Sequence, residues 1–203
     1  MADAQIEGEP QAGQAQGGWK TRDFIVAAGL AVPLGLIFAV WLLAWNAAQL
    51  APWLAHFVAG LYVVAGVVVG YVLRRPGTAF LGEMMAAFVE WPLAPYGAII
   101  LFLGMLQAVG VEAVFASTRY RNYSLRILML AGAVGALGVL FGRFYFAFGY
   151  GNLAVIDQLV RLISTILGGA VLGGLLGKFI ADSLVKTGVL NNFPIARDQV
   201  REV

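Results

Sequence analysis

The sequence predicts an all-α integral membrane protein with six transmembrane helices and with both termini in the cytoplasm. Hydrophobic residues make up 61% of the chain and charged residues 12%, a composition too apolar for the solvated surface of a soluble domain. The 26 glycines favour close packing of helices in lipid over the alternating pattern of a β-barrel. All basic residues except Arg143 and Arg161 can be placed on one side of the membrane, and this asymmetry indicates membrane topology rather than nucleic-acid binding.

The chain divides into a polar, disordered cytoplasmic tail at 1–19, a membrane domain at 20–190 and a second cytoplasmic tail at 191–203. The six spans are expected at about 24–45, 54–73, 78–92, 96–117, 124–148 and 154–185. Arg74 and Arg75 end the second span in the cytoplasm, and Pro76 and Gly77 form the turn into the third. Because the third span has only about 15 residues, we expect it to stop below the outer surface.

Small residues recur every four positions in two of the spans. Ala27, Ala31 and Gly35 form such a stripe in the first span, and Gly169 and Gly173 belong to overlapping GxxxG pairs in the sixth. Stripes of this kind let another helix approach closely.

Polar side chains in the spans fall into two groups by depth, because a helix rises about 1.5 Å per residue and successive spans alternate in direction. The inner group is Glu83 and Glu112. The outer group contains candidate ligand contacts and charged residues of the last two spans: Glu90, Trp91, Gln107, Arg143, Tyr145, Tyr150, Asn152, Asp157 and Arg161. Trp41 belongs to an aromatic cluster at the outer end of the first span, which is either an interface belt or a cover over a ligand.

Glu90 is the principal candidate for a ligand contact. A charged side chain at membrane depth costs about 2.5–3.5 kcal/mol and normally marks a functional site. No basic residue lies within four positions of Glu90, so its partner must come from another helix or from a ligand, and a carboxylate prefers a cation or an amine. The aromatic residues of the outer group would suit a cationic or flat heteroaromatic ring.

The other charged residues have more ordinary interpretations. Asp157 and Arg161 are four residues apart on one helix and are expected to neutralise each other. Glu83 and Glu112 are expected to bind a basic residue or a backbone donor, with a proton or sodium relay as the alternative.

The sequence carries no motif of an enzyme: it has no GxSxG, no HExxH and no Walker A lysine after a glycine-rich loop. With one His and no Cys, it offers no multi-histidine or thiolate metal site. We therefore expect no catalytic residue, metal or cofactor.

Several separated motifs resemble the YkoE family: RPGTAFLGE at 75–83, AFVE at 87–90, QAVGVEAVF at 107–115 and RNYS at 121–124, with similar matches at 161–164, 175–178 and 182–191. Members of this family are substrate-binding S components of energy-coupling-factor (ECF) transporters for thiamine or its hydroxymethylpyrimidine precursor. The resemblance spans about 22–191.

The resemblance implies a six-helix, multi-pass protein of the bacterial plasma membrane, which works with a transmembrane T component and cytoplasmic ATPase modules. It implies docking through Ala27 and Ala31, and capture of the vitamin near the outer face for ATP-driven uptake. Thiamine has a cationic thiazolium and an aminopyrimidine, so the candidate ligand contacts are Glu90, Trp91, Gln107, Tyr145, Trp41, Asn152 and Glu83. Two alternatives are an assembly subunit without a ligand of its own and a proton-coupled carrier that acts alone.

Overall fold

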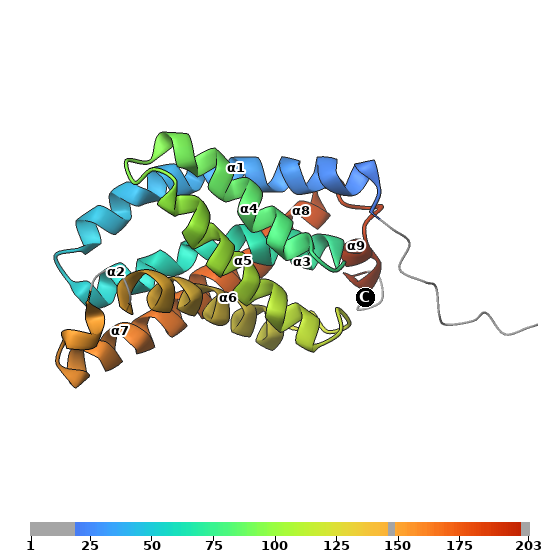
Figure 1. Ribbon diagram of the computed structural model, residues 1–203. Helices are drawn as coiled ribbons and strands as arrows, with labels where there is room; N and C mark the ends of the chain where they lie inside the picture. Colours follow the sequence, from blue (N-terminus) through green and yellow to red (C-terminus); the bar gives the residue numbers. More distant parts are fainter. Residues whose placement is uncertain (1–18, 146–148, 200–203) are drawn as a thin grey trace, which may run out of the picture.

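The computed structural model describes residues 19–145 and 149–199, and every regular element in these ranges is helical. The predicted all-helical fold is therefore confirmed. The described elements are α1 (Thr21–Ala48), α2 (Pro52–Val58), η1 (Ala59–Val63), α3 (Val64–Leu73), α4 (Thr78–Glu90), η2 (Trp91–Leu93), α5 (Ile99–Ser117), α6 (Leu125–Val139), η3 (Leu140–Tyr145), η4 (Tyr150–Asn152), α7 (Val155–Gly168), η5 (Gly169–Leu175), α8 (Leu176–Lys186) and α9 (Pro194–Gln199). Figure 1 shows α1 and α4 along one side of the bundle and α7 along the other.

Five helical stretches are long and apolar enough to cross a membrane: Thr21–Ala48, Pro52–Leu73, Ile99–Ser117, Leu125–Gly142 and Val155–Lys186. The third predicted span corresponds to α4, which has only 13 residues and ends at Glu90, next to Trp91 and Pro92. The count of six spans and the cytoplasmic termini remain predictions, although the start of α1 and α9 lie at the same end of the bundle (Figure 1).

The core consists of aliphatic residues of α3 surrounded by the other helices. Every residue of α3 is buried, and α1, α4, α5, α6 and α8 all contact it. Because an apolar helix that is covered on all sides cannot face lipid, α3, which forms the second half of the second predicted span, is the centre of the bundle.

The small-residue stripe of α1 packs inside this bundle. Ala27 and Ala31 are fully buried, and a Cβ atom added at Gly35 would lie 2.6 Å from the Ala86 carbonyl oxygen of α4. The stripe therefore lets α4 approach α1, and in this arrangement a partner protein cannot reach it.

The segment after α8 is packed against the bundle. Leu190, Phe193 and Ile195 are buried, α9 contacts α3, and the Arg22 guanidinium lies 4.7 Å from the centre of the Phe193 ring. The first residues of the predicted tail at 191–203 thus pack on the bundle, and the division into membrane domain and tail stays a prediction.

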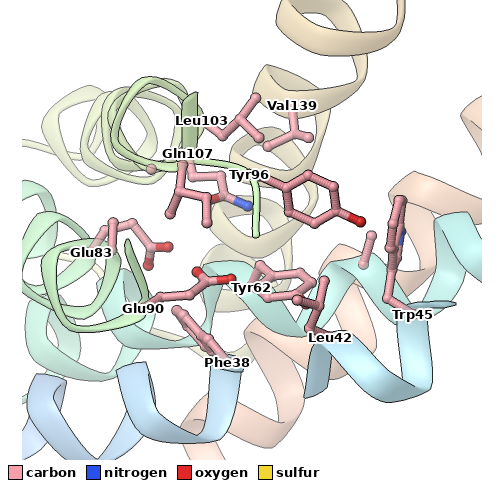
Figure 2. A pocket seen from close by; sticks show the side chains of 14 residues that line it. Phe38, Leu42, Trp45, Tyr62, Glu83, Glu90, Tyr96, Leu103, Gln107 and Val139 are labelled. Carbon is pink, nitrogen blue, oxygen red and sulfur yellow. The ribbon is translucent and has the colours of Figure 1, made fainter. Parts of the chain in front are cut away.

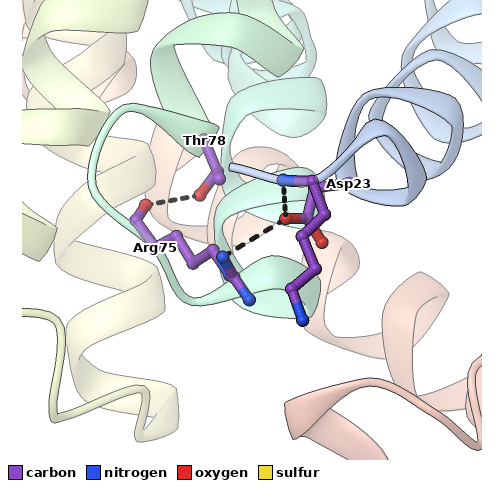
Figure 3. Close-up of polar contacts among 4 residues, drawn as sticks. Asp23, Arg75 and Thr78 are labelled. Atoms are coloured by element: carbon purple, nitrogen blue, oxygen red, sulfur yellow. Dashed lines mark hydrogen bonds and ion pairs between the residues drawn. The ribbon is translucent and has the colours of Figure 1, made fainter. Parts of the chain in front are cut away.

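A buried ion pair ties the start of α1 to the turn between α3 and α4 (Figure 3). The Asp23 carboxylate lies 3.3 Å from Arg75 Nη1 and accepts a hydrogen bond from the Lys20 backbone N–H at 3.0 Å. The Arg75 carbonyl oxygen accepts a bond from the Thr78 hydroxyl at 2.7 Å. The side chain of Asp23 is 2% exposed and that of Arg75 is 25% exposed, so the two partners are not equally shielded.

This inequality predicts which substitution costs more stability. Arg75→Gln leaves a carboxylate buried without its cation and is expected to cost about 3 kcal/mol. Asp23→Asn leaves Arg75 able to reach water and is expected to cost about 1–2 kcal/mol. Thermal unfolding of the purified variants checks this order, and Lys186→Gln, an exposed cation on α8, serves as the control. Equal losses for both partners would contradict the explanation.

Candidate ligand-binding site

A pocket lies between α1, η1, α4, α5 and α6. Its empty volume is about 600 Å³, which includes open solvent at its mouth. The lining residues are Phe38, Leu42, Trp45, Ala59, Tyr62, Glu83, Ala87, Glu90, Tyr96, Ile100, Leu103, Gly104, Gln107 and Val139. A concave, largely apolar pocket with a few convergent polar groups is typical of a small-molecule site.

Three polar side chains meet in this pocket: Glu83, Glu90 and Gln107 are 1%, 8% and 7% exposed. Figure 2 shows both carboxylates and the Gln107 amide directed into the same space. Glu83 accepts a hydrogen bond from the Gly66 backbone N–H at 2.7 Å, which holds its carboxylate at the inner side of the pocket. The site can therefore accept hydrogen bonds at two carboxylates and both accept and donate them at an amide.

The sequence of α4 explains why both carboxylates reach the pocket. Glu83, Ala87 and Glu90 occupy positions i, i+4 and i+7, which lie on one face of a helix. The small residue between them admits α5, because a Cβ atom added at Gly104 would lie 2.6 Å from that of Ala87. This close approach brings Gln107 of α5 next to the carboxylates.

Aromatic rings form two pairs around the polar groups. The rings of Phe38 and Tyr62 are 5.4 Å apart at an interplanar angle of 65°, and those of Trp45 and Tyr96 are 6.2 Å apart at 89°. The Tyr96 hydroxyl donates to Asn46 Oδ1 at 3.4 Å. In Figure 2 the Trp45 and Tyr96 pair lies at the opposite side of the pocket from Glu83.

The structure brings together Glu83, Glu90 and Gln107 of the predicted ligand contacts. Trp91 lies outside the pocket, is 40% exposed and packs near Phe88, with ring centres 6.4 Å apart. Trp41 is also not among the lining residues, and its indole N–H donates to the Val58 carbonyl oxygen at 2.8 Å. Asn152 is exposed in η4.

The side chain of Tyr145 lies outside the part of the chain that the structure describes. Its predicted contact with a ligand, like the roles of the other candidates, stays a prediction.

Sequence reasoning missed Tyr62 and Tyr96 as pocket residues and assigned Trp45 no role beyond the aromatic cluster. Tyr62 is one of two tyrosines within the largely apolar second span, the other being Tyr71, and Tyr96 begins the segment before α5. The signal for Trp45 was its position one helical turn after Trp41 at the outer end of the first span.

The charged residues of α7 do not neutralise each other as the sequence suggested. Arg161 Nη1 donates to the Tyr150 hydroxyl at 2.9 Å and lies 3.3 Å from His56 Nε2. Thr165 Oγ1 lies 3.2 Å from His56 Nδ1, whereas Asp157 is exposed. The expected intrahelical pair is thus replaced by a contact between α2, α7 and η4, because buried His56 offers Arg161 a partner inside the protein.

Among the residues that the structure describes, no group of three or more His, Asp or Glu side chains is placed to hold a metal ion. The two pocket carboxylates would supply only part of such a ligand set.

Comparison with known proteins gives three matches. A sequence model of the family described as "ABC-type cobalt transport system, permease component" matches residues 22–138. A protein of Bacillus subtilis (strain 168) named as an HMP/thiamine permease protein, YkoE, is 33% identical over 183 residues, which cover 89% of this chain and 92% of that protein. A solved structure described as the crystal structure of an S-component of an ECF transporter matches with a TM-score of 0.86 at 30% identity, and the match covers 91% of this chain and 95% of that chain.

Proposed function

Since the chain belongs to the YkoE family of ECF transporter S components and is a multi-pass protein of the bacterial plasma membrane, we propose that it captures thiamine or hydroxymethylpyrimidine for uptake. The single observation that carries this proposal is the pocket that combines two buried carboxylates, one amide and four aromatic rings. The protein binds its ligand and releases it without chemical change.

The pocket suits the two rings of thiamine. Glu90 accepts a hydrogen bond from the exocyclic amine of the aminopyrimidine, or it offsets the positive thiazolium charge. Gln107 bonds the pyrimidine edge, which presents both a donor and acceptors. Phe38, Tyr62 and Tyr96 provide aromatic faces for a flat or cationic ring.

Uptake requires partners, and we propose the transmembrane T component and the cytoplasmic ATPase modules of an ECF transporter. The relative from Bacillus subtilis is named as a permease and the matching structure is described as an S component, which supports this assignment. Docking through Ala27 and Ala31 would require neighbouring helices of this chain to move away from α1, because both residues are fully buried in the bundle.

A binding experiment with purified protein in detergent tests the proposal. Thiamine and hydroxymethylpyrimidine are titrated separately by calorimetry, and the unfolding temperature is measured with each. A ligand at a hundred times its Kd stabilises the folded state by about 2.7 kcal/mol, so at least one of the two compounds is expected to raise the unfolding temperature.

The cobalt ion is the control ligand, because the family description mentions cobalt and the pocket offers only two carboxylates. Stabilisation by cobalt alone would contradict the proposal. The absence of any effect from the two organic compounds would favour the assembly-subunit alternative.

A further inference from the structure

The helix that carries both pocket carboxylates has no cap of its own. Gly77, the residue before α4, has φ of 83° and provides no side chain, and no cap bond comes from the helix's own side chains. The first N–H groups of a helix lack partners within the helix, so they need an acceptor from elsewhere.

Glu112 of α5 supplies that acceptor. Its Oε1 accepts a hydrogen bond from the Gly77 backbone N–H at 2.5 Å, and its Oε2 accepts one from the Phe80 backbone N–H at 3.0 Å. A carboxylate at this position is also favoured by the positive end of the helix dipole. Glu112 therefore caps α4 from the neighbouring helix.

The turn after α5 holds Glu112 in place. The Tyr120 hydroxyl donates to Glu112 Oε1 at 2.7 Å. Burial and the hydrogen bond to Glu112 raise the pKa of Tyr120 to about 12, so the phenol keeps its proton near neutral pH. Arg119 and Tyr120 both have positive φ, 53° and 58°, a conformation that costs energy for residues other than glycine. This backbone conformation directs Tyr120 back toward the carboxylate.

We propose that Glu112 is a positioning residue for the ligand pocket, because it fixes the register of α4 against α5 and thereby the placement of Glu90 and Glu83 relative to Gln107. The inference rests on the proposed function, since it concerns the affinity of that pocket. A slip of one residue along a helix is about 1.5 Å, which is enough to misplace a hydrogen-bonding group. The tight contact between Ala87 and Gly104 transmits such a slip directly to the lining of the pocket.

A double-mutant cycle separates positioning from general stabilisation. Thiamine affinity is measured by calorimetry for the wild type, Glu112→Gln, Glu90→Gln and the double variant. Glu112→Gln is expected to weaken binding about tenfold when Glu90 is present and less than about threefold when it is absent, because coupled residues are not additive. The loss of thermal stability caused by Glu112→Gln is expected to be the same whether residue 90 is Glu or Gln.

The matched control is Asp182→Asn, which removes a carboxylate that accepts from Tyr71 at 3.1 Å and pairs with Lys178, away from α4. It is expected to leave the affinity unchanged. If Glu112→Gln does not fold, Tyr120→Phe, which removes only one bond to Glu112, is placed in the same cycle with an expected loss of about threefold.

The positioning role of Glu112 would be overturned if folded Glu112→Gln bound thiamine with unchanged affinity. It would also be overturned if the losses of binding free energy in Glu112→Gln and Glu90→Gln simply added in the double variant. A wild-type protein that binds neither thiamine nor hydroxymethylpyrimidine would instead overturn the proposed function, and this result is obtained before any variant is made.

Discussion

Glu90→Gln is expected to weaken thiamine binding about a hundredfold, which corresponds to a loss of about 2.7 kcal/mol. The carboxylate is 8% exposed and lines the pocket together with Gln107. Replacement by an amide keeps the size of the side chain, removes its charge and puts a donor where an acceptor faced the ligand. A hydrogen bond to a charged group contributes about 1.5–3 kcal/mol, and an unmatched buried donor adds to the cost. Calorimetric titration of the purified variant measures the effect.

Asp157→Asn is the matched control, because it removes the same charge from an exposed position on α7 outside the pocket. It is expected to bind thiamine with wild-type affinity. Affinity that is undiminished in Glu90→Gln, or diminished equally in both variants, would refute the assigned role of Glu90.

The positions of the helices along the chain and the family of the protein could be predicted from the sequence, because both depend on local sequence patterns. Long apolar stretches locate the spans, and Pro76 and Gly77 locate the turn before α4. The order of the spans and the short length of α4 follow directly from residue counts. The family resemblance, which depends on separated motifs, is confirmed by the comparisons.

Depth along the membrane separated the pocket residues only in part, because Glu90 and Gln107 of the outer group line the pocket together with Glu83 of the inner group. Counting residues along the helices put Glu90 and Gln107 at similar depth, and the structure brings them together. Depth does not, however, fix the direction in which a side chain points around its helix. Neighbouring residues of a helix point about 100° apart, so a chain that directs Glu90 inward directs Trp91 away from the pocket.

Partners on other helices could not be read from the sequence. Arg161 has a suitable carboxylate four residues away, yet it binds Tyr150 and lies beside His56 of another helix. Likewise, the stripe at Ala27 and Ala31 predicts a close helix contact but does not tell whether the second helix belongs to this chain. In the structure the second helix belongs to this chain, because Gly35 of the stripe lies directly against Ala86 of α4 and both alanines of the stripe are fully buried. For Glu112 the sequence left a basic residue, a backbone donor and a relay open, and the structure shows two backbone N–H donors, those of Gly77 and Phe80.

Gly132→Ala is expected to cost about 3 kcal/mol of stability, because the glycines of α6 and η5 meet backbone against backbone. A Cβ atom at Gly132 would lie 2.1 Å from the Gly169 carbonyl oxygen and 2.6 Å from the Gly174 backbone nitrogen. Neither atom is the end of a flexible side chain, so whole helices must move apart. Since η5 also contacts η1, which lines the pocket through Ala59 and Tyr62, the same variant is expected to lose ligand affinity.

Thermal unfolding and size-exclusion elution in detergent measure the stability effect, and Gly29→Ala is the control. A Cβ atom at Gly29 of α1 would meet nothing within 4 Å, so this substitution is expected to be neutral or to stabilise the helix by about 0.5–1 kcal/mol. The two substitutions add the same methyl group to a helical glycine, and only the surroundings differ. If Gly132→Ala unfolded at the same temperature as Gly29→Ala, the close contact between α6 and η5 could not be what holds the sixth span against the bundle.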